Sequence, residues 1–556
     1  VFNSQTGELK IIDFGLSTVL SRENTALKSP NVLEGTLAYI SPEQTGRMNR
    51  AIDYRTDFYS LGVTFYRILT NQLPFDATDA MELVHCHIAR QPVPPHRVNP
   101  EIPLVVSEIV MKLLAKTAED RYQSALGIRD DLVICLRQLE TDGKIKDFVL
   151  GEQDISNKFQ IPQKLYGRST QIETLLAAFE RITHGTSQLM LVAGYSGIGK
   201  SVLVQEIYKP ITERRGYYIS GKFDQFQRNI PYSAIVSAFR ELVRQLLTET
   251  SEQLHLWCDK LVSALGVNGQ IIIDVIPEIE LIIGKQPVVL ELAGTESQNR
   301  FNLVFQNFIH VFCQQQHPLV IFLDDLQWAD IATLKLMQLM MTDVDTSYLL
   351  LIGAYRDNEV SAAHPLKITL SDIQKSGATV NSILLSPLDL TCVNQLITDT
   401  LKCDEERAKP LAELVLAKTQ GNPFFLKEFL QSLYTENLLD FDFLSSSWQW
   451  NLDQIQARGI TDNVVELMTQ KIQKLPELTQ EVLKTAACIG HQFDLKTLSN
   501  VGEKQPKTTA NELWSAVREG LIVPVGDDYK FLQTDLNPDE FKVAYRFVHD
   551  RIQQAA

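Results

Sequence analysis

A glycine-rich segment with one lysine and one serine has the spacing of a phosphate-binding loop. Residues 194–201 have the sequence G-Y-S-G-I-G-K-S and match the pattern G-x-x-x-x-G-K-[ST]. Glycines allow backbone N–H groups to close around phosphate oxygens, and the N-terminus of the following helix adds its positive end. In this pattern Lys200 would bridge the β- and γ-phosphates of ATP, and Ser201 would ligate Mg²⁺. The expected nucleotide-binding residues of the loop are Gly194, Gly197, Gly199, Lys200 and Ser201.

Two consecutive carboxylates supply the acidic partner that such a loop requires. The apolar run 319–323 is followed directly by Asp324 and Asp325. A carboxylate at the end of a buried strand can ligate Mg²⁺, and its neighbour can orient an attacking water. We assign Asp324 to the metal and Asp325 to the water, as the catalytic residue. Two aspartates after a strand can also simply begin a helix, but the presence of the loop favours the catalytic interpretation.

Several further motifs make residues 165–556 resemble the STAND branch of P-loop ATPases, which are regulatory relatives of the AAA+ class. L-Y-G-R at 165–168 is similar to the family's entry motif beside the adenine, and Y-R-D at 355–357 stands where the family places an arginine that senses the γ-phosphate. G-N-P-F-F at 421–425 is similar to the G-x-P turn of the helical subdomain that closes over the base. F-V-H-D at 547–550 resembles the histidine motif of the winged-helix subdomain, which contacts the β-phosphate in the ADP-bound state. The resemblance implies nucleotide contacts from Arg168, Arg356, Pro423 and His549.

An Asp-Phe-Gly triplet at residues 13–15 could hold a second metal ion. It follows an apolar run and precedes a Ser/Thr-rich segment, S-P-E at 41–43 and E-D-R-Y at 119–122. In this order the motifs resemble the C-lobe of eukaryotic-like Ser/Thr protein kinases. The resemblance implies that Asp13 holds Mg²⁺ against the ATP phosphates.

The same resemblance assigns supporting roles to other residues. It implies a buried pair between Glu43 and Arg121, capping of the catalytic loop by Asp57, and help from Thr36 in fixing a Ser/Thr acceptor. The chain contains no Gly-rich loop over ATP, no N-lobe lysine and no H-R-D catalytic loop, which in the family precede D-F-G. We therefore expect the chain to have no kinase activity by itself, and to be a piece of a longer protein.

The pattern of apolar segments predicts a multidomain chain, because 556 residues exceed what one core usually organises. Alternating strands and helices in its central part are typical of an α/β P-loop fold with a parallel sheet. The predicted units are a mainly helical kinase C-lobe (1–140), a polar linker (141–164), the ATPase (165–390), a helical subdomain (391–475) and a winged-helix-like subdomain (476–556). The expected strands of the sheet are 189–193, 216–222, 319–324, 348–355 and 379–385. A terminal hairpin is expected from 521–525 and 529–532.

The charge balance argues against a nucleic-acid partner. Lys and Arg total 52 against 68 Asp and Glu, and the net charge of -16 repels phosphate backbones. No apolar run has the length that a membrane span needs. Seven scattered cysteines without a C-x-x-C pair fit reduced thiols in a cytoplasmic protein.

The order of the units resembles very large bacterial multidomain sensor kinases. Our first hypothesis is a signal-transduction enzyme, a Ser/Thr protein kinase regulated by a switch that binds and hydrolyses ATP with Mg²⁺. The second is a nucleotide-gated scaffold with a degenerate kinase domain. Protein substrates or partners, and an ATP-dependent homo-oligomer, would follow from either hypothesis. A winged-helix DNA regulator is disfavoured by the negative charge and the lack of a basic recognition helix.

Overall fold

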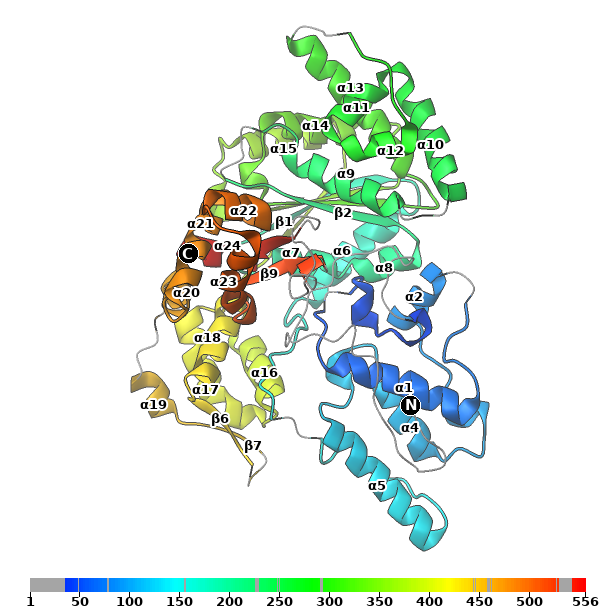
Figure 1. Ribbon diagram of the computed structural model, residues 1–556, viewed down its shortest axis with the longest axis vertical. Helices are drawn as coiled ribbons and strands as arrows, with labels where there is room; N and C mark the ends of the chain where they lie inside the picture. The colour runs from blue at the N-terminus through cyan, green and yellow to red at the C-terminus, as the bar shows by residue number, and fades with distance from the viewer. Residues whose placement is uncertain are drawn as a thin grey trace.

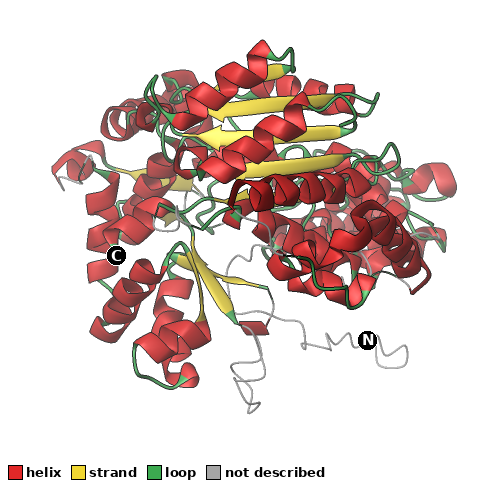
Figure 2. Cartoon of the chain, turned by 90° about the horizontal axis from the view of Figure 1, so that it is seen from above, coloured by secondary structure: helices red, strands yellow, loops and turns green. Residues whose placement is uncertain are grey.

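The computed structural model describes residues 36–556 except 49, 78–79, 155–156, 226–229, 248, 250, 291–293, 444, 446, 458–460, 462, 527 and 530–542. The predicted metal ligand Asp13 therefore lies outside the described residues. In the described part, helices surround one five-stranded sheet (Figures 1 and 2). None of the helices in this part has the length and apolar character to cross a membrane. All seven cysteines are free thiols.

The N-terminal unit is helical, as its amphipathic patterns predict. Val105, Ile109 and Leu113 of one helix, α4 (Leu104–Leu113), belong to an apolar cluster with Ile128 and Cys135 of α5 (Ala125–Asp142). The elements of this unit are η3 (Leu37–Tyr39), η4 (Pro42–Thr45), α1 (Arg55–Thr70), α2 (Ala80–Ile88), α3 (Pro95–Val98), α4 (Leu104–Leu113), η5 (Ala118–Asp120) and α5 (Ala125–Asp142).

The segment between α5 and the ATPase has no described helix or strand, yet it is bonded to both sides. The Asp154 carboxylate accepts hydrogen bonds from the backbone N–H groups of Gln123 (2.7 Å) and Ser124 (2.9 Å) before α5. The ring of Phe159 stacks on Tyr434, with ring centroids 4.8 Å apart. This polar segment therefore holds the C-lobe against the helical part that follows the ATPase.

The central sheet consists of five parallel strands in the order β2-β3-β4-β1-β5. Its strands are β1 (Ser187–Ala193), β2 (Tyr217–Lys222), β3 (Leu319–Asp324), β4 (Leu349–Tyr355) and β5 (Val380–Leu384). Each of the five predicted strand segments is confirmed, with shifts of one residue or two at some ends. Because the strands are parallel, their carboxyl ends meet at one edge of the sheet.

Helices cover both faces of the sheet, since alternate strand residues point to opposite sides. Met190 and Val192 belong to the apolar cluster under one group of helices, and Leu189 and Leu191 to the cluster under the other. The first group is α6 (Ser169–Ile182), α7 (Lys200–Gln205) and α8 (Tyr208–Glu213). The second is α9 (Ser233–Leu246), α10 (Ser251–Leu265), α11 (Gly269–Val275), α12 (Glu280–Ile283), α13 (Gly294–Phe312), α14 (Ile331–Thr342) and α15 (Pro365–Lys375).

The remaining residues form a helical part and a small three-stranded sheet that share one apolar core, from Val393 to Ile552. β9 pairs with β10. Most of the segment at 529–532, predicted to complete a terminal hairpin, lies outside the described residues. The elements are α16 (Leu390–Leu401), α17 (Glu405–Thr419), α18 (Pro423–Thr435), β6 (Leu439–Asp442), β7 (Ser447–Trp450), α19 (Leu452–Ala457), α20 (Val464–Gln473), α21 (Glu477–Ile489), β8 (Gln492–Asp494), α22 (Leu495–Val501), α23 (Pro506–Arg518), β9 (Ile522–Val525), β10 (Ala544–Phe547) and α24 (Asp550–Ala555).

Candidate nucleotide-binding site

The glycine-rich loop joins the end of β1 to the start of α7. The Lys200 side chain is buried, and its Nζ donates hydrogen bonds to the carbonyl oxygens of Gly194 (2.8 Å) and Tyr195 (3.1 Å). Burial lowers the pKa of Lys200, while Asp324 and Asp325 act in the opposite direction. The backbone of Gly199 has a φ of 99°, which side chains disfavour, and a Cβ there would meet nothing within 4 Å. Open space above a turn of backbone N–H groups fits a phosphate.

Ser201 and Asp324 bring two hard oxygens together at the carboxyl edge of the sheet. The Ser201 hydroxyl donates to Asp324 Oδ2 at 2.7 Å. No group of three or more His, Cys, Asp or Glu side chains in the described part of the chain is placed to hold a metal. A hydroxyl beside one carboxylate suits Mg²⁺, which keeps water and phosphate oxygens as its other ligands. These two residues therefore fit the magnesium site predicted for them.

Asp325 lies in a different environment from its neighbour. Its backbone is left-handed (φ 57°), and its carboxylate accepts a hydrogen bond from Gln327 Nε2 at 2.7 Å. Arg356 Nε and Lys222 Nζ each lie 3.3 Å from one of its oxygens. Burial raises the pKa of Asp325, and the negative charge of Asp324 raises it further. A buried carboxylate with a raised pKa, beside a metal-binding pair, is suited to accept a proton from water.

Arg356 extends from the end of β4 to the C-terminal helix α24. Its Nη2 lies 2.6 Å from Asp550 Oδ2, and its Nη1 lies 2.9 Å from Glu359. Lys222 Nζ contacts the other oxygen of Asp550 at 2.5 Å. Burial alone would raise the pKa of Asp550, but Lys222 and His491 hold it well below its usual range. The expected γ-phosphate sensor is thus ion-paired with carboxylates from two parts of the chain.

The turn before α18 lies directly on the phosphate-binding loop. Asn422 Nδ2 donates to the carbonyl oxygen of Ser196 (2.9 Å), and the Phe424 N–H donates to that of Gly197 (3.2 Å). A Cβ on Gly197 would come 2.8 Å from Asn422 Oδ1, so glycine is needed for this approach. Pro423, between them, begins α18. The structure brings the predicted turn and the loop together.

His549 stacks on the same turn. Its ring lies 3.9 Å from that of Phe424, centroid to centroid, with the planes 12° apart. Its Nδ1 accepts a hydrogen bond from the backbone N–H of Arg551, so His549 caps the N-terminus of α24. Burial lowers the pKa of His549 to about 4, which keeps the ring neutral.

Arg168 is bonded to the segment that follows β5, which passes close to Gly194: a Cβ on Gly194 would come 2.9 Å from the Leu385 carbonyl oxygen. Arg168 occupies the position before α6, is buried, and donates from Nη2 to the carbonyl oxygen of Ser386 at 2.5 Å. This hydrogen bond fixes Arg168 to the segment after β5. An adenine contact for this residue stays a prediction.

The kinase-like motifs form a buried ion pair. Arg121 donates from both Nη atoms to Glu43, at 2.7 and 2.8 Å, and both side chains are almost fully buried. Thr56 donates a further hydrogen bond to Glu43 at 2.7 Å. The predicted pair is therefore present. Asp57 is exposed in the first turn of α1.

Lys222 and Asp550 join this site although neither was assigned a role from the sequence. Lys222 is the last residue of β2 and is in register with Asp324 on β3. Its place at the end of a predicted strand was the available signal, because ends of parallel strands converge. Asp550 was part of a recognised motif, but only the fold shows that it contacts Arg356.

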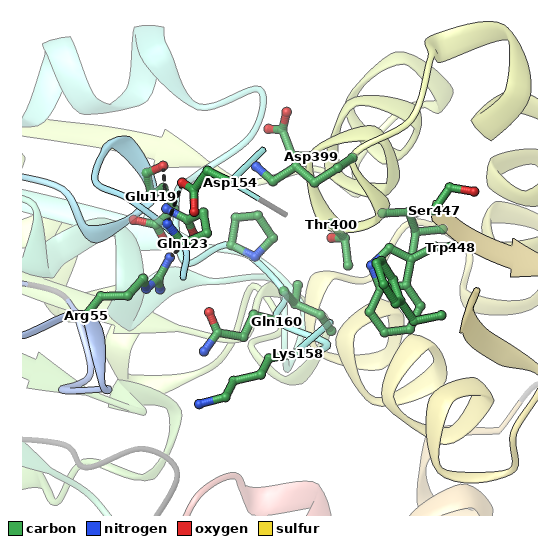
Figure 3. A pocket seen from close by; sticks show the side chains of 15 residues that line it. Arg55, Glu119, Gln123, Asp154, Lys158, Gln160, Asp399, Thr400, Ser447 and Trp448 are labelled. Carbon is green, nitrogen blue, oxygen red and sulfur yellow. Dashed lines mark hydrogen bonds between the residues drawn. The ribbon is translucent and has the colours of Figure 1, made fainter. Parts of the chain in front are cut away.

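A separate cavity of about 230 Å³ lies between the C-lobe and the helical part (Figure 3). Arg55, Gln123 and Asp154 line one side of it, and Thr400 and Trp448 line the other. None of the predicted nucleotide-site residues borders it, so it is distinct from the candidate site.

Comparison with known proteins supports the two-part organisation. Residues 1–130 match the model of the protein kinase domain, and residues 164–352 match that of the AAA ATPase domain. Hybrid signal transduction histidine kinase G of Dictyostelium discoideum is 33% identical over 94% of this chain and 18% of its own length. Peroxide stress-activated histidine kinase mak3 of Schizosaccharomyces pombe is 24% identical over 88% of this chain and 24% of its own length. The chain thus spans about a fifth of these relatives.

The N-terminal part has relatives of its own. Serine/threonine-protein kinase PknB of Mycolicibacterium smegmatis is 34% identical over 23% of this chain and 20% of its own length. Among solved structures, Cdc6p of Pyrobaculum aerophilum matches 71% of this chain and 94% of its own, with 11% identity and a TM-score of 0.32.

Proposed function

From the premise that the chain joins a protein kinase domain to an AAA ATPase domain, we propose that it is a signalling protein in which a STAND switch regulates a Ser/Thr protein kinase. The switch binds and hydrolyses ATP. The observation that carries the proposal is the 2.7 Å contact between Ser201 and Asp324, beside the buried Lys200. This arrangement provides a cation for phosphates and two oxygens for a metal at one edge of the sheet.

The residues of the site divide the work of hydrolysis among them. The loop from Gly194 to Gly199 surrounds the phosphates with backbone N–H groups, and Lys200 neutralises the β- and γ-phosphates. Ser201 and Asp324 hold Mg²⁺, which would neutralise charge on the phosphate oxygens. Asp325 orients the attacking water and accepts its proton.

The ion pairs of Asp550 supply the switch. Arg356 and Lys222 are held by a carboxylate that belongs to α24, not to the ATPase sheet. A γ-phosphate competes with Asp550 for Arg356, so ATP favours release of α24 and ADP favours the contact. A nucleotide shifts such an equilibrium only through its different affinity for the two states.

The kinase half acts on protein substrates in the longer protein, with Asp13 holding Mg²⁺ there. The 556-residue chain has no protein kinase activity alone, because its sequence lacks the catalytic loop and the N-lobe lysine. The buried pair of Glu43 and Arg121 has a structural role, because it joins two segments of the C-lobe.

Nucleotide titration of the isolated chain tests the proposal. Lys200→Ala should weaken ATP binding by about 1.5–3 kcal/mol, because a charge-assisted contact to phosphate is lost. Lys375→Ala is the matched control, since that lysine is exposed on α15 and pairs only with Asp372 in the described part of the chain. Equal ATP affinity in wild type and Lys200→Ala, or ATP turnover without Mg²⁺, would contradict the proposed site.

A further inference from the structure

We propose that a contact between C-lobe residues 46–48 and 50 and the helices that follow the phosphate-binding loop couples the nucleotide state to the kinase half. The inference rests on the proposed function and identifies the surface through which the switch would act. Arg47, Arg50 and α2 lie on the kinase side of this contact, and α7 and α8 lie on the ATPase side.

Arg47 is the centre of the contact. The C-lobe residue is 5% exposed, and its guanidinium interacts with Tyr208, Tyr217 and Glu249 of the ATPase. Burial lowers the pKa of Arg47 to about 10, and these three partners oppose that shift. An arginine buried against two tyrosines has the character of the anchor residues that dominate binding at protein interfaces. Loss of Arg47 should therefore loosen the two halves.

Arg50 ties the same segment to the helix of the phosphate-binding loop. Its Nη1 lies 3.8 Å from Glu206 Oε1, and Glu206 caps the C-terminus of α7. α7 begins with Lys200, six residues before Glu206. Six residues of helix span about 9 Å. The first residue of α7 therefore belongs to the phosphate-binding loop, and the residue at its other end contacts the C-lobe. A displacement of the first turn of α7 must also displace the partner of Arg50.

α2 carries the contact into the C-lobe. It packs against α8 of the ATPase and against η3 and η4 of the C-lobe; Figure 1 shows α2 next to α8. Val84 and Ile88 of α2 are buried with Ile40, in a cluster that also includes Leu37. Leu37 and Ile40 lie in the segment that the kinase resemblance places beside the acceptor, after Thr36. α2 therefore contacts both the ATPase and the part of the C-lobe that the kinase resemblance places on the substrate side.

Hydrogen bonds join Arg47 to the turn that contains Glu43. Thr45 Oγ1 donates to the Pro42 carbonyl oxygen (2.6 Å) and accepts from the Arg47 N–H (3.2 Å). Glu43, in the same turn, is fixed to the C-lobe by Arg121. Thr45 thus links Arg47 to the turn of Glu43, which joins the ATPase contact to the buried ion pair of the C-lobe.

Hydrogen–deuterium exchange of the 556-residue chain tests the coupling. With Mg²⁺ and either ADP or a non-hydrolysable ATP analogue, amides of residues 37–51 should differ in exchange rate between the two nucleotides. Because coupling is reciprocal, Arg47→Ala should change the ratio of the two nucleotide dissociation constants by about fivefold or more. Arg129→Ala, which removes an exposed arginine on α5 paired with Asp130, should leave the ratio unchanged.

Exchanging the charges of Arg50 and Glu206 distinguishes loss of the contact from unfolding of the variant. Arg50→Glu should abolish the nucleotide-dependent difference in exchange, and Glu206→Arg in the same chain should restore it. Nucleotide binding with identical exchange at 37–51 in both states, or an unchanged ratio in Arg47→Ala, would overturn the coupling alone. Absence of nucleotide binding in the wild-type chain would overturn the proposed function and the coupling with it.

Discussion

Asp324 and Asp325 are adjacent in the sequence, but their backbone conformations differ, so their carboxylates contact different residues. Asp324 ends β3 with extended geometry and faces Ser201. The left-handed backbone of Asp325 turns its carboxylate toward Arg356 and Lys222. A non-glycine residue in this conformation is uncommon, although aspartate adopts it more readily than most residues.

Substitution by asparagine should separate the two roles. Asp325→Asn keeps the size of the side chain but cannot accept a proton from water, so turnover should fall by about 100-fold or more while ATP stays bound. Asp324→Asn replaces one hard ligand with a neutral amide and should raise the Mg²⁺ concentration that half-saturates binding. Steady-state ATPase assays at several Mg²⁺ concentrations measure both effects. Undiminished turnover in Asp325→Asn would remove the role given to that residue.

Arg121 is the largest fully buried charged side chain among the residues described. Arg121→Ala should destabilise the C-lobe by about 3–5 kcal/mol, because it leaves Glu43 buried without its partner. Arg129→Ala, on the exposed surface of α5, should change stability by at most about 0.5 kcal/mol. Urea denaturation followed by fluorescence measures both. Equal midpoints for the two variants would show that the buried pair contributes nothing.

Elements with a strong apolar period were the most predictable part of this chain. β3 is bounded by Leu319 and Asp324, as predicted, because a buried parallel strand is a continuous apolar run. β10 was missed, since Ala544 to Phe547 is short and pairs with β9 across a long connection. Contacts between distant elements, such as Asp550 with Arg356, left no local pattern in the sequence. The residues of the phosphate-binding loop were predictable because phosphate binding fixes their spacing in the sequence. The place of Lys222 in the site depends on β2 lying beside β3, which the sequence does not show.

The contact between α24 and the sheet edge should restrain nucleotide binding. Asp550→Asn removes the charge that holds Arg356 and Lys222, so both cations become available to phosphates. We expect ATP affinity to rise by about fivefold or more, the lower range of coupling between sites. Asp494→Asn is the control, because Asp494 caps α22 and is exposed. Identical ATP affinity in Asp550→Asn and Asp494→Asn would show that α24 does not compete with the nucleotide.

At the scale of the whole molecule, charged groups at the junction of three units link its stability to pH. His491 and His549 both lie beside Asp550, and burial lowers the pKa of His491 to about 3 and that of His549 to about 4. Lys222, Arg356 and Arg551 also face His549 and oppose its protonation. Both histidines are therefore neutral in the folded chain and would gain a proton only on unfolding.

This arrangement predicts a loss of stability on acidification. A folded pKa below the unfolded value of 6.5 gives stability that is present above pH 6.5 and lost as the pH falls toward 4. Between pH 7.5 and 5, each histidine should cost roughly 2 kcal/mol. Asp550 does not mask the effect, because its own pKa is lowered and its contribution changes only at more acidic pH. Asp325, whose pKa is raised to about 6, takes up a proton in the folded chain and offsets part of the loss, so the comparison of variants isolates the histidine.

Urea midpoints across this range should fall less steeply in His549→Gln than in wild type. His184→Gln, at an exposed position on the surface, should leave the slope unchanged. Parallel slopes for wild type and His549→Gln would show that the stacked histidine is not the titrating group.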